Sequence, residues 1–145
     1  MKSISILHKN DNRNIEMKKK YKNLFDLTDK VAIVTGASKG IGASIAKAFA
    51  EFGANVVVSS RSQEGIDKVV NEIKAEGYNA TACICHVGED DQLKNLVETT
   101  INKYGKIDIL VNNAGINPVF DRLENADEKL FNKILDINTK SPSNY

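Results

Sequence analysis

Short apolar runs alternate with helix-length amphipathic segments between residues 31 and 111. Runs rich in β-branched and other apolar residues at 31–34, 56–58, 80–85 and 107–111 predict four buried strands. Between these runs, apolar residues recur three and four positions apart and each segment ends at a glycine, a pattern typical of helices. The predicted helices carry Ile41, Ile45, Phe49 and Phe52, then Ile66, Val69, Val70 and Ile73, and then Leu93, Leu96, Val97, Ile101 and Tyr104; they stop at Gly53, Gly77 and Gly105, and a further helix begins near Asp127.

Strands that alternate with helices of this length predict right-handed βαβ units and a parallel sheet covered on both faces. The predicted fold class is therefore α/β, a partial Rossmann fold with a doubly wound parallel sheet in the strand order 3-2-1-4. In that order the run at 107–111, apolar on both faces, is an open edge, which natural sheets usually shorten, charge or cover. We expect this strand to need a neighbour that these residues do not supply.

Composition limits the class of protein further. The chain has 145 residues and 41% hydrophobic content, enough for one domain. Its 20 Lys and Arg residues balance 19 Asp and Glu residues, so no overall field favours nucleic acid or an anionic membrane. Without a long apolar run, we expect a cytoplasmic protein.

The first residues differ in character from the rest of the chain. Residues 1–24 are rich in Lys, Asn and Ser, and they predict a disordered basic leader before a domain at 25–145. Met17 is a possible alternative start. An organelle-targeting peptide is the other alternative, and Asp11 and Glu16 argue against it.

A glycine-rich segment follows the first predicted strand. Residues 35–42 read Thr-Gly-Ala-Ser-Lys-Gly-Ile-Gly and lead into the first helix. Glycine permits a tight turn and lets backbone N–H groups and the helix N-terminus approach a pyrophosphate. Between a strand and a helix of a βαβ unit, this segment predicts a dinucleotide site.

The end of the second predicted strand indicates which dinucleotide. An acidic residue there would accept hydrogen bonds from a ribose 2′-hydroxyl, but the chain has Ser59, Ser60 and Arg61. Arg61 suits a 2′-phosphate, and Lys39 adds a second cation, so NADP(H) is favoured over NAD(H). The alternative is that both are ordinary solvated surface cations.

Cys83, Cys85 and His86 form a possible metal-ligand group on the third predicted strand. No fourth ligand is evident, and the cysteines lie on a predicted interior strand, so we expect buried thiols and no metal. Two residues apart on one extended strand, they cannot form a relaxed disulfide, which favours a reducing compartment.

Three motifs occur in a fixed order over residues 27–140: the segment at 35–42, Asn-Asn-Ala-Gly at 112–115, and Asn138 after a further helix. With these motifs the chain resembles the short-chain dehydrogenases/reductases. Two further segments, Ser-Ser-Arg at 59–61 and Cys-His-Val-Gly at 85–88, are similar to the NADP-dependent carbonyl and retinal reductase branch of that family, with bacterial sugar-type dehydrogenases as near relatives. His86 and Val87 replace the family's usual Asp-Val beside the adenine, where a histidine can stack or hydrogen-bond. The resemblance implies a relay role for Asn138 and cofactor contacts at Gly36, Ser38, Lys39, Gly40, Ile41, Gly42, Ser60, Arg61, His86, Val87, Asn113, Ala114 and Gly115.

The family's catalytic serine and its Tyr-x-x-x-Lys pair do not follow Asn138 in residues 139–145. We therefore expect a truncated chain that is inactive alone. Its full-length form would transfer hydride between NADP(H) and a small carbonyl or alcohol substrate, as a homo-oligomer without nucleic acid or membrane partners. The alternatives are a non-catalytic dinucleotide-binding module and a subunit completed by a second chain.

Overall fold

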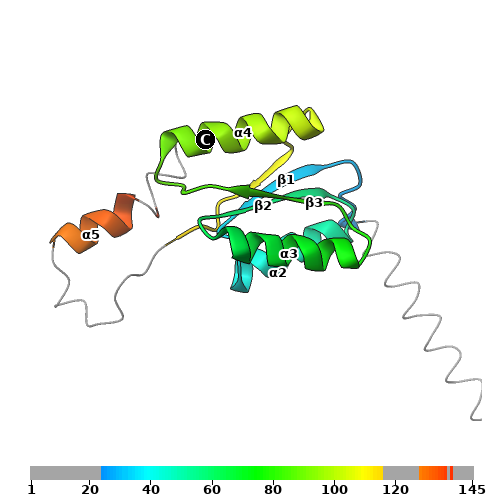
Figure 1. Cartoon of the computed structure of the whole chain (residues 1–145), viewed down its shortest axis with the longest axis horizontal. Helices are drawn as coiled ribbons and strands as arrows, with labels where there is room; N and C mark the ends of the chain where they lie inside the picture. The colour runs from blue at the N-terminus through cyan, green and yellow to red at the C-terminus, as the bar shows by residue number, and fades with distance from the viewer. Residues whose placement is uncertain (1–23, 116–127, 137, 139–145) are drawn as a thin grey trace, which may run out of the picture.

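The computed structural model describes residues 24–115, 128–136 and 138 (Figure 1). Within them the sheet is parallel and has the order β3-β2-β1-β4, as the sequence predicts. The predicted leader, apart from Leu24, and the residues after Asn138 lie outside the described residues. The elements are β1 (Val31–Thr35), α2 (Gly40–Glu51), β2 (Asn55–Ser60), α3 (Gln63–Ala75), β3 (Ala80–Ile84), α4 (Asp90–Tyr104), β4 (Ile109–Val111) and α5 (Glu128–Leu135).

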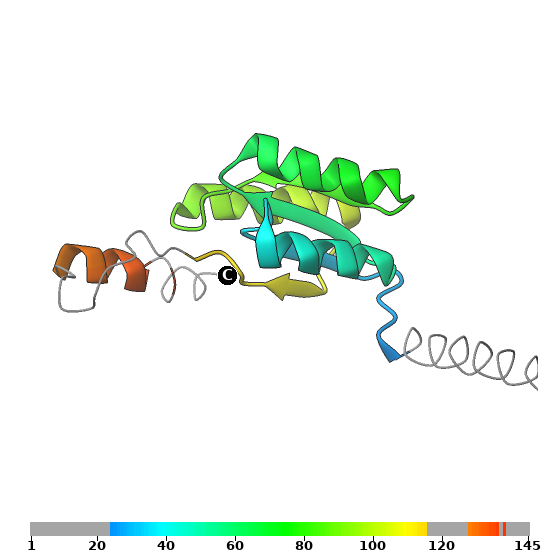
Figure 2. The same cartoon turned by 90° about the horizontal axis from the view of Figure 1, so that it is seen from below.

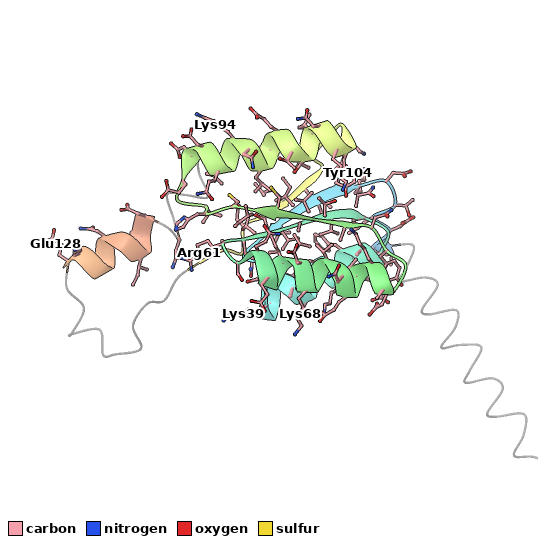
Figure 3. All side chains as sticks on the ribbon, in the orientation of Figure 1. Lys39, Arg61, Lys68, Lys94, Tyr104 and Glu128 are labelled. Carbon is pink, nitrogen blue, oxygen red and sulfur yellow. The ribbon has the colours of Figure 1, made fainter. Side chains whose placement is uncertain are left out.

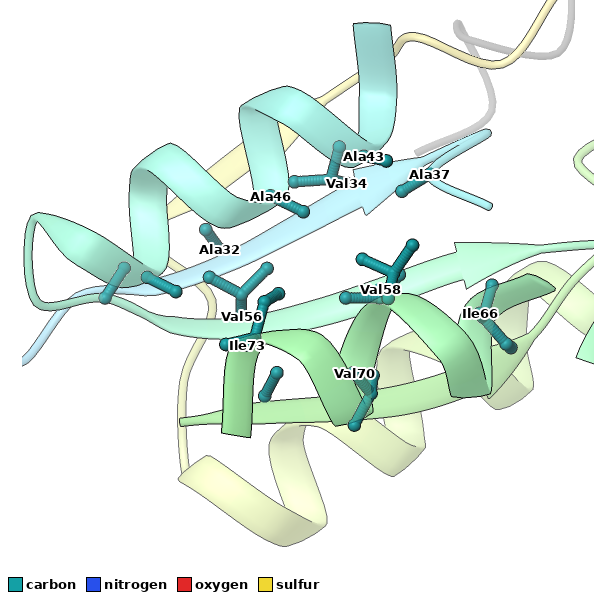
Figure 4. Packing of buried hydrophobic residues seen from close by; sticks show 14 residues of the cluster. Ala32, Val34, Ala37, Ala43, Ala46, Val56, Val58, Ile66, Val70 and Ile73 are labelled. Carbon is teal, nitrogen blue, oxygen red and sulfur yellow. The ribbon is translucent and has the colours of Figure 1, made fainter. Parts of the chain in front are cut away.

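Helices cover both faces of the sheet, which confirms the doubly wound α/β class. α2 and α3 lie on one face and α4 lies on the other (Figures 1 and 2). Successive strand residues point to opposite faces, so each strand contributes to two cores. The first core packs strand residues such as Val34 and Val58 against Ala46 and Ile73 (Figure 4). The second packs Ile33, Val57, Cys83 and Cys85 against Leu93 and Leu96.

The buried face of α2 differs from the predicted one. Ile41 is 74% exposed, and the residues that α2 buries are small: Gly42, Ala43, Ala46 and Ala50. Ile45 and Phe49 only flank this core. The residue spacing predicted the helix correctly but not its buried face. Because alanine and glycine side chains are small, the face of α2 that carries them packs closely against the sheet and is the buried one.

The fourth strand is shorter than predicted because the Asp108 side chain, and not a backbone carbonyl, accepts the hydrogen bond from the Val31 N–H. The Asp108 N–H donates to the Val31 carbonyl at 2.9 Å, and its Oδ2 accepts from the Val31 N–H at 2.8 Å. These bonds and Lys106, whose Nζ lies 3.0 Å from Oδ2, hold the pKa of Asp108 below its usual value. Regular pairing with β1 therefore begins at Ile109.

The third strand is an edge strand of the described sheet, so its predicted interior position was wrong. It also ends at Ile84, one residue earlier than predicted. Its cysteines are nevertheless buried and unpaired, as predicted, because they face the core beneath α4. Among the described helices, none has the length and apolar character of a membrane-spanning segment.

The predicted helix stops agree with the structure. Gly53, Gly77 and Gly105 all have positive φ, and Gly105 directly caps α4 in the left-handed conformation. Each helix therefore turns back toward the next parallel strand. This repeated turn brings the loops after β1, β2, β3 and β4 to the same edge of the sheet.

Candidate functional site

The loops at the carboxyl ends of the strands enclose an open cleft of about 540 Å³. The segments that follow all four strands contribute to it, and within the described part of the chain no Asp or Glu lines it. Lys39 and Arg61 lie at this end of the molecule (Figure 3). The lining residues are Gly36, Ser38, Lys39, Ser60, Arg61, Ser62, Cys85, His86, Val87, Asn113, Ala114 and Gly115.

The glycines after β1 allow two backbone segments to approach each other. A Cβ on Gly36 would lie 2.8 Å from the Ala114 Cα, and a Cβ on Gly42 would lie 2.5 Å from the Asn113 Nδ2. Gly36 also has a φ of +64°, which disfavours larger residues. Among the described residues, no side chain caps the N-terminus of α2, and its first turn contains no acidic residue. Its free N–H groups and positive dipole end are therefore available to an anion.

Thr35, which begins the glycine-rich segment but is not among the predicted contact residues, joins the two segments. Its buried hydroxyl donates to the Val111 carbonyl at 3.1 Å and accepts from the N–H groups of Asn113 and Ala114 at 3.2 and 3.1 Å. In return, the Asn113 Nδ2 donates to the carbonyls of Thr35 and Gly36 at 3.0 and 3.2 Å. The signal in the sequence that could have identified Thr35 is that it is a polar residue at the end of an otherwise apolar strand.

The residues after β2 form the cationic wall of the cleft. The Ser60 hydroxyl accepts from the Ser62 N–H at 3.1 Å, and the Ser62 hydroxyl caps α3 by accepting from the Gly65 N–H at 3.2 Å. This short turn fixes the backbone on both sides of Arg61. Neither Arg61 nor Lys39 forms an ion pair within the part of the chain that the structure describes. Both cations are thus available to a phosphate.

The third wall contains His86, Val87 and Cys85. Burial, and then the neighbouring Cys83, raises the pKa of the Cys85 thiol to about 11. Burial likewise raises the pKa of Cys83. Both residues therefore stay protonated near neutral pH, which does not suit a thiolate ligand. No group of three or more His, Cys, Asp or Glu residues able to hold a metal occurs within 24–115, 128–136 and 138.

Not every predicted contact residue lines the cleft. Gly40, Ile41 and Gly42 lie outside its lining: Gly42 supports it from beneath, whereas Ile41 is exposed to solvent. Asn138 lies beside its last residue, since its Oδ1 would be 3.3 Å from a Cβ on Gly115. Ser62 and Cys85 line the cleft without having been predicted.

A parallel sheet in this order, with a glycine-rich loop opening α2 at the cleft, defines a domain of the Rossmann class. The short chain dehydrogenase family model matches residues 30–145. The chain belongs to that family.

Curated and solved relatives agree with this assignment. The chain is 48% identical over 115 residues to dehydrogenase/reductase SDR family member 4 of Oryctolagus cuniculus, an alignment covering 79% of this chain and 44% of the relative. A metagenomic short-chain oxidoreductase solved in complex with NADP aligns with a TM-score of 0.75 at 34% identity, over 82% of this chain and 54% of that one. A 3-ketoacyl-(acyl-carrier-protein) reductase of Brucella melitensis, complexed with NADH, gives 0.73 at 35% identity, over 81% and 47%. The chain thus spans about half the length of these relatives.

Proposed function

We propose that this chain binds NADP(H) in the cleft, and that the protein to which it belongs transfers hydride between NADP(H) and a carbonyl or alcohol substrate. The observation that carries the cofactor choice is that Arg61 and Lys39 both line the cleft, whereas no Asp or Glu does so among the described residues. A carboxylate would suit the free 2′-hydroxyl of NAD(H), whereas a guanidinium suits a 2′-phosphate. The solved relatives include complexes with both NADP and NADH, so the distinction depends on these residues.

The glycine-rich loop suits a dinucleotide because Gly36 and Gly42 let it pack closely against the segment that contains Asn113. A Cβ on Gly36 or Gly42 would meet backbone or side-chain atoms at less than 3.0 Å. The bare N-terminus of α2 would hold the pyrophosphate, and Arg61 would hold the 2′-phosphate. The Asn113 and Gly115 segment would border the nicotinamide end. When bound, the nicotinamide ring accepts or delivers the hydride.

The reaction itself needs groups beyond those in the cleft. The 145 residues contain no Tyr-x-x-x-Lys pair, so we expect binding without turnover from this chain by itself. Asn138, beside Gly115, would act as a relay residue in the complete protein. The unpaired outer edge of β4, within the described sheet, favours a second candidate, a subunit completed by another chain. A cytoplasmic location and a homo-oligomeric complete protein also remain proposals.

Fluorescence titration of the 145-residue chain with NADPH and NADH tests the proposed function. Arg61→Ala should weaken NADPH binding by about tenfold or more, because it removes a charge-assisted bond, and should leave NADH binding unchanged. Lys68→Ala is the matched control, since Lys68 is an exposed cation of α3 that does not line the cleft. Equal losses for both cofactors would contradict the assignment of Arg61. Absence of saturable binding to folded protein would disprove cofactor binding altogether.

A further inference from the structure

The loop between β3 and α4 supplies the third wall of the cleft, and hydrogen bonds hold it at both ends. At its start, the Cys85 N–H donates to the Ser60 carbonyl at 3.0 Å, which ties the loop to β2. At its end, the Glu89 N–H donates to the His86 carbonyl at 2.9 Å, which closes a turn before α4. His86 and Val87 of this loop line the cleft. The position of this wall therefore depends on how the loop is attached to β2 and to α4.

A side chain outside the cleft adds a second attachment to α4. The His86 N–H donates to the Gln92 Oε1 at 2.8 Å. Gln92 is exposed and does not line the cleft. It is the third residue of α4, a position from which glutamine can reach back to the N–H of the N-cap residue. Here the N-cap residue Glu89 donates its N–H to the His86 carbonyl, and Gln92 accepts instead from a residue three positions farther back.

We propose that Gln92 is a positioning residue of the cofactor site, which holds His86 and Val87 in the conformation that accepts the dinucleotide. This role rests on the proposed binding of NADP(H). If a loop spends part of its time in other conformations, the apparent dissociation constant rises by the inverse of the fraction that is competent to bind. The Gln92 side-chain oxygen raises that fraction before any ligand arrives. It must be the oxygen that faces the loop, because a backbone N–H only donates.

Two exposed amide side chains of α4 form a matched pair for the test. Gln92→Ala removes the acceptor, whereas Asn95→Ala removes the same kind of group one turn along the helix. The free energy of unfolding should change little in either variant, because both side chains are exposed and alanine favours the helix. NADPH titration should show a dissociation constant raised about threefold or more in Gln92→Ala and unchanged in Asn95→Ala. A smaller rise in Gln92→Ala, or an equal rise in both variants, overturns the proposal.

Glutamate separates the role of the oxygen from a general effect on the helix. Gln92→Glu keeps an oxygen acceptor and adds a negative charge, and Asn95→Glu adds the same charge one turn along α4. Because the effect of the charge is present in both variants, they should bind NADPH within about twofold of each other. A greater loss in Gln92→Glu would show that an oxygen acceptor at this position does not restore the site, and the proposal would fail.

The hold on the loop can be measured without a ligand. In the 145-residue chain, hydrogen exchange of the His86 amide, followed in ¹H–¹⁵N spectra, should be faster by about threefold or more in Gln92→Ala than in the wild type or Asn95→Ala. Unchanged exchange would overturn the proposal even if NADPH affinity fell, because the bond would then not hold the loop. If the wild-type chain binds no NADPH, the proposed function itself fails, an outcome distinct from normal binding by Gln92→Ala.

Discussion

The hydroxyl of Thr35 serves two walls of the cleft at once. It donates to Val111 and accepts from the N–H groups of Asn113 and Ala114. Its exposed fraction is 1%, so water does not replace these bonds. This hydroxyl therefore holds the Asn-Asn-Ala-Gly segment against the glycine loop, together with the two bonds that the Asn113 Nδ2 donates.

Replacing this oxygen should affect both stability and cofactor binding. Thr35→Val keeps the shape but removes the acceptor of the Ala114 N–H, whereas the Asn113 N–H still donates to the Val111 carbonyl at 3.0 Å. We therefore expect a loss of about 1–3 kcal/mol in the free energy of unfolding. NADPH affinity should fall with it. Thr35→Ser retains the hydroxyl and should lose less of both. Urea denaturation and NADPH titration measure the two effects, and equal behaviour of the valine and serine variants would show that the hydroxyl is not responsible.

The Cys85 thiol gives a prediction about alkaline pH. Its folded pKa of about 11 lies above the unfolded value of 9.0, because burial disfavours the thiolate. A raised pKa stabilises the fold fully below the unfolded pKa, and this contribution is lost as pH rises through the folded value. The free energy of unfolding should therefore fall between pH 9 and about 11 more steeply in the wild type than in Cys85→Ala. Parallel profiles by urea denaturation would contradict this.

Residues whose roles follow from local sequence could be predicted, and those that act at long range could not. Gly36, Lys39 and Arg61 stand at fixed distances from a strand end, so the chain pattern alone placed them at the site. Thr35 acts on groups 76 to 79 positions away. No local pattern reports such a contact before the strand order is known.

At the scale of elements, the spacing of hydrophobic residues predicted which helices and strands form and in what order. It predicted less well which face of a helix is buried. All four strands and the helices between them occur as expected, and so does the sheet order. The buried stripe of α2 was missed because Ala43 and Ala46 lie beside larger residues that share the same period. The shortened start of β4 was missed because Asp108 bonds to Val31 with its side chain, which apolar patterning does not describe.

The first turn of α3 contacts the glycine loop, and this contact can be tested. A Cβ on Gly65 would lie 2.7 Å from the Ser38 Cβ, so Gly65→Ala should displace the Ser60–Ser62 turn from the loop. We expect NADPH affinity to fall several-fold. The free energy of unfolding should change little, because alanine favours the helix by about 1 kcal/mol over glycine and offsets part of the clash.

The matched control is Gly77→Ala at the far end of α3. Gly77 has open space around it but a φ of +86°, so alanine there introduces backbone strain without a clash. It should lower stability and leave NADPH affinity unchanged. If Gly65→Ala also left the affinity unchanged, α3 would not position the cationic wall. Thermal denaturation and NADPH titration of both variants separate the two effects.

At the scale of the whole molecule, the described residues leave one side of the sheet without a neighbour. β4 pairs only with β1, and the described residues supply no strand on its other side. On the same sheet face as α4, Leu110 is 37% exposed, and Val97 and Ile101 of that helix are 37% and 42% exposed. Apolar surface beside an unpaired strand edge commonly binds further chain or a second molecule.

This surface predicts how the 145-residue chain behaves in solution. We expect concentration-dependent self-association through the outer edge of β4, because its unpaired N–H and C=O groups and the Leu110 side chain can pair with another copy. Leu110→Lys should shift the chain toward monomer in light scattering, since a charge on an edge strand opposes such pairing. NADPH affinity should be unchanged, because Leu110 does not line the cleft.

Leu24→Lys is the control for this experiment, since Leu24 is 67% exposed but lies outside the sheet. It makes the same change in charge, and removes at least as exposed an apolar side chain, without touching β4. If both variants reduce association equally, general surface hydrophobicity is responsible and the edge is not. If the wild-type chain is already monomeric at high concentration, the outer edge of β4 does not pair with another copy. A stable monomer with no co-purifying partner would also count against completion by a second chain.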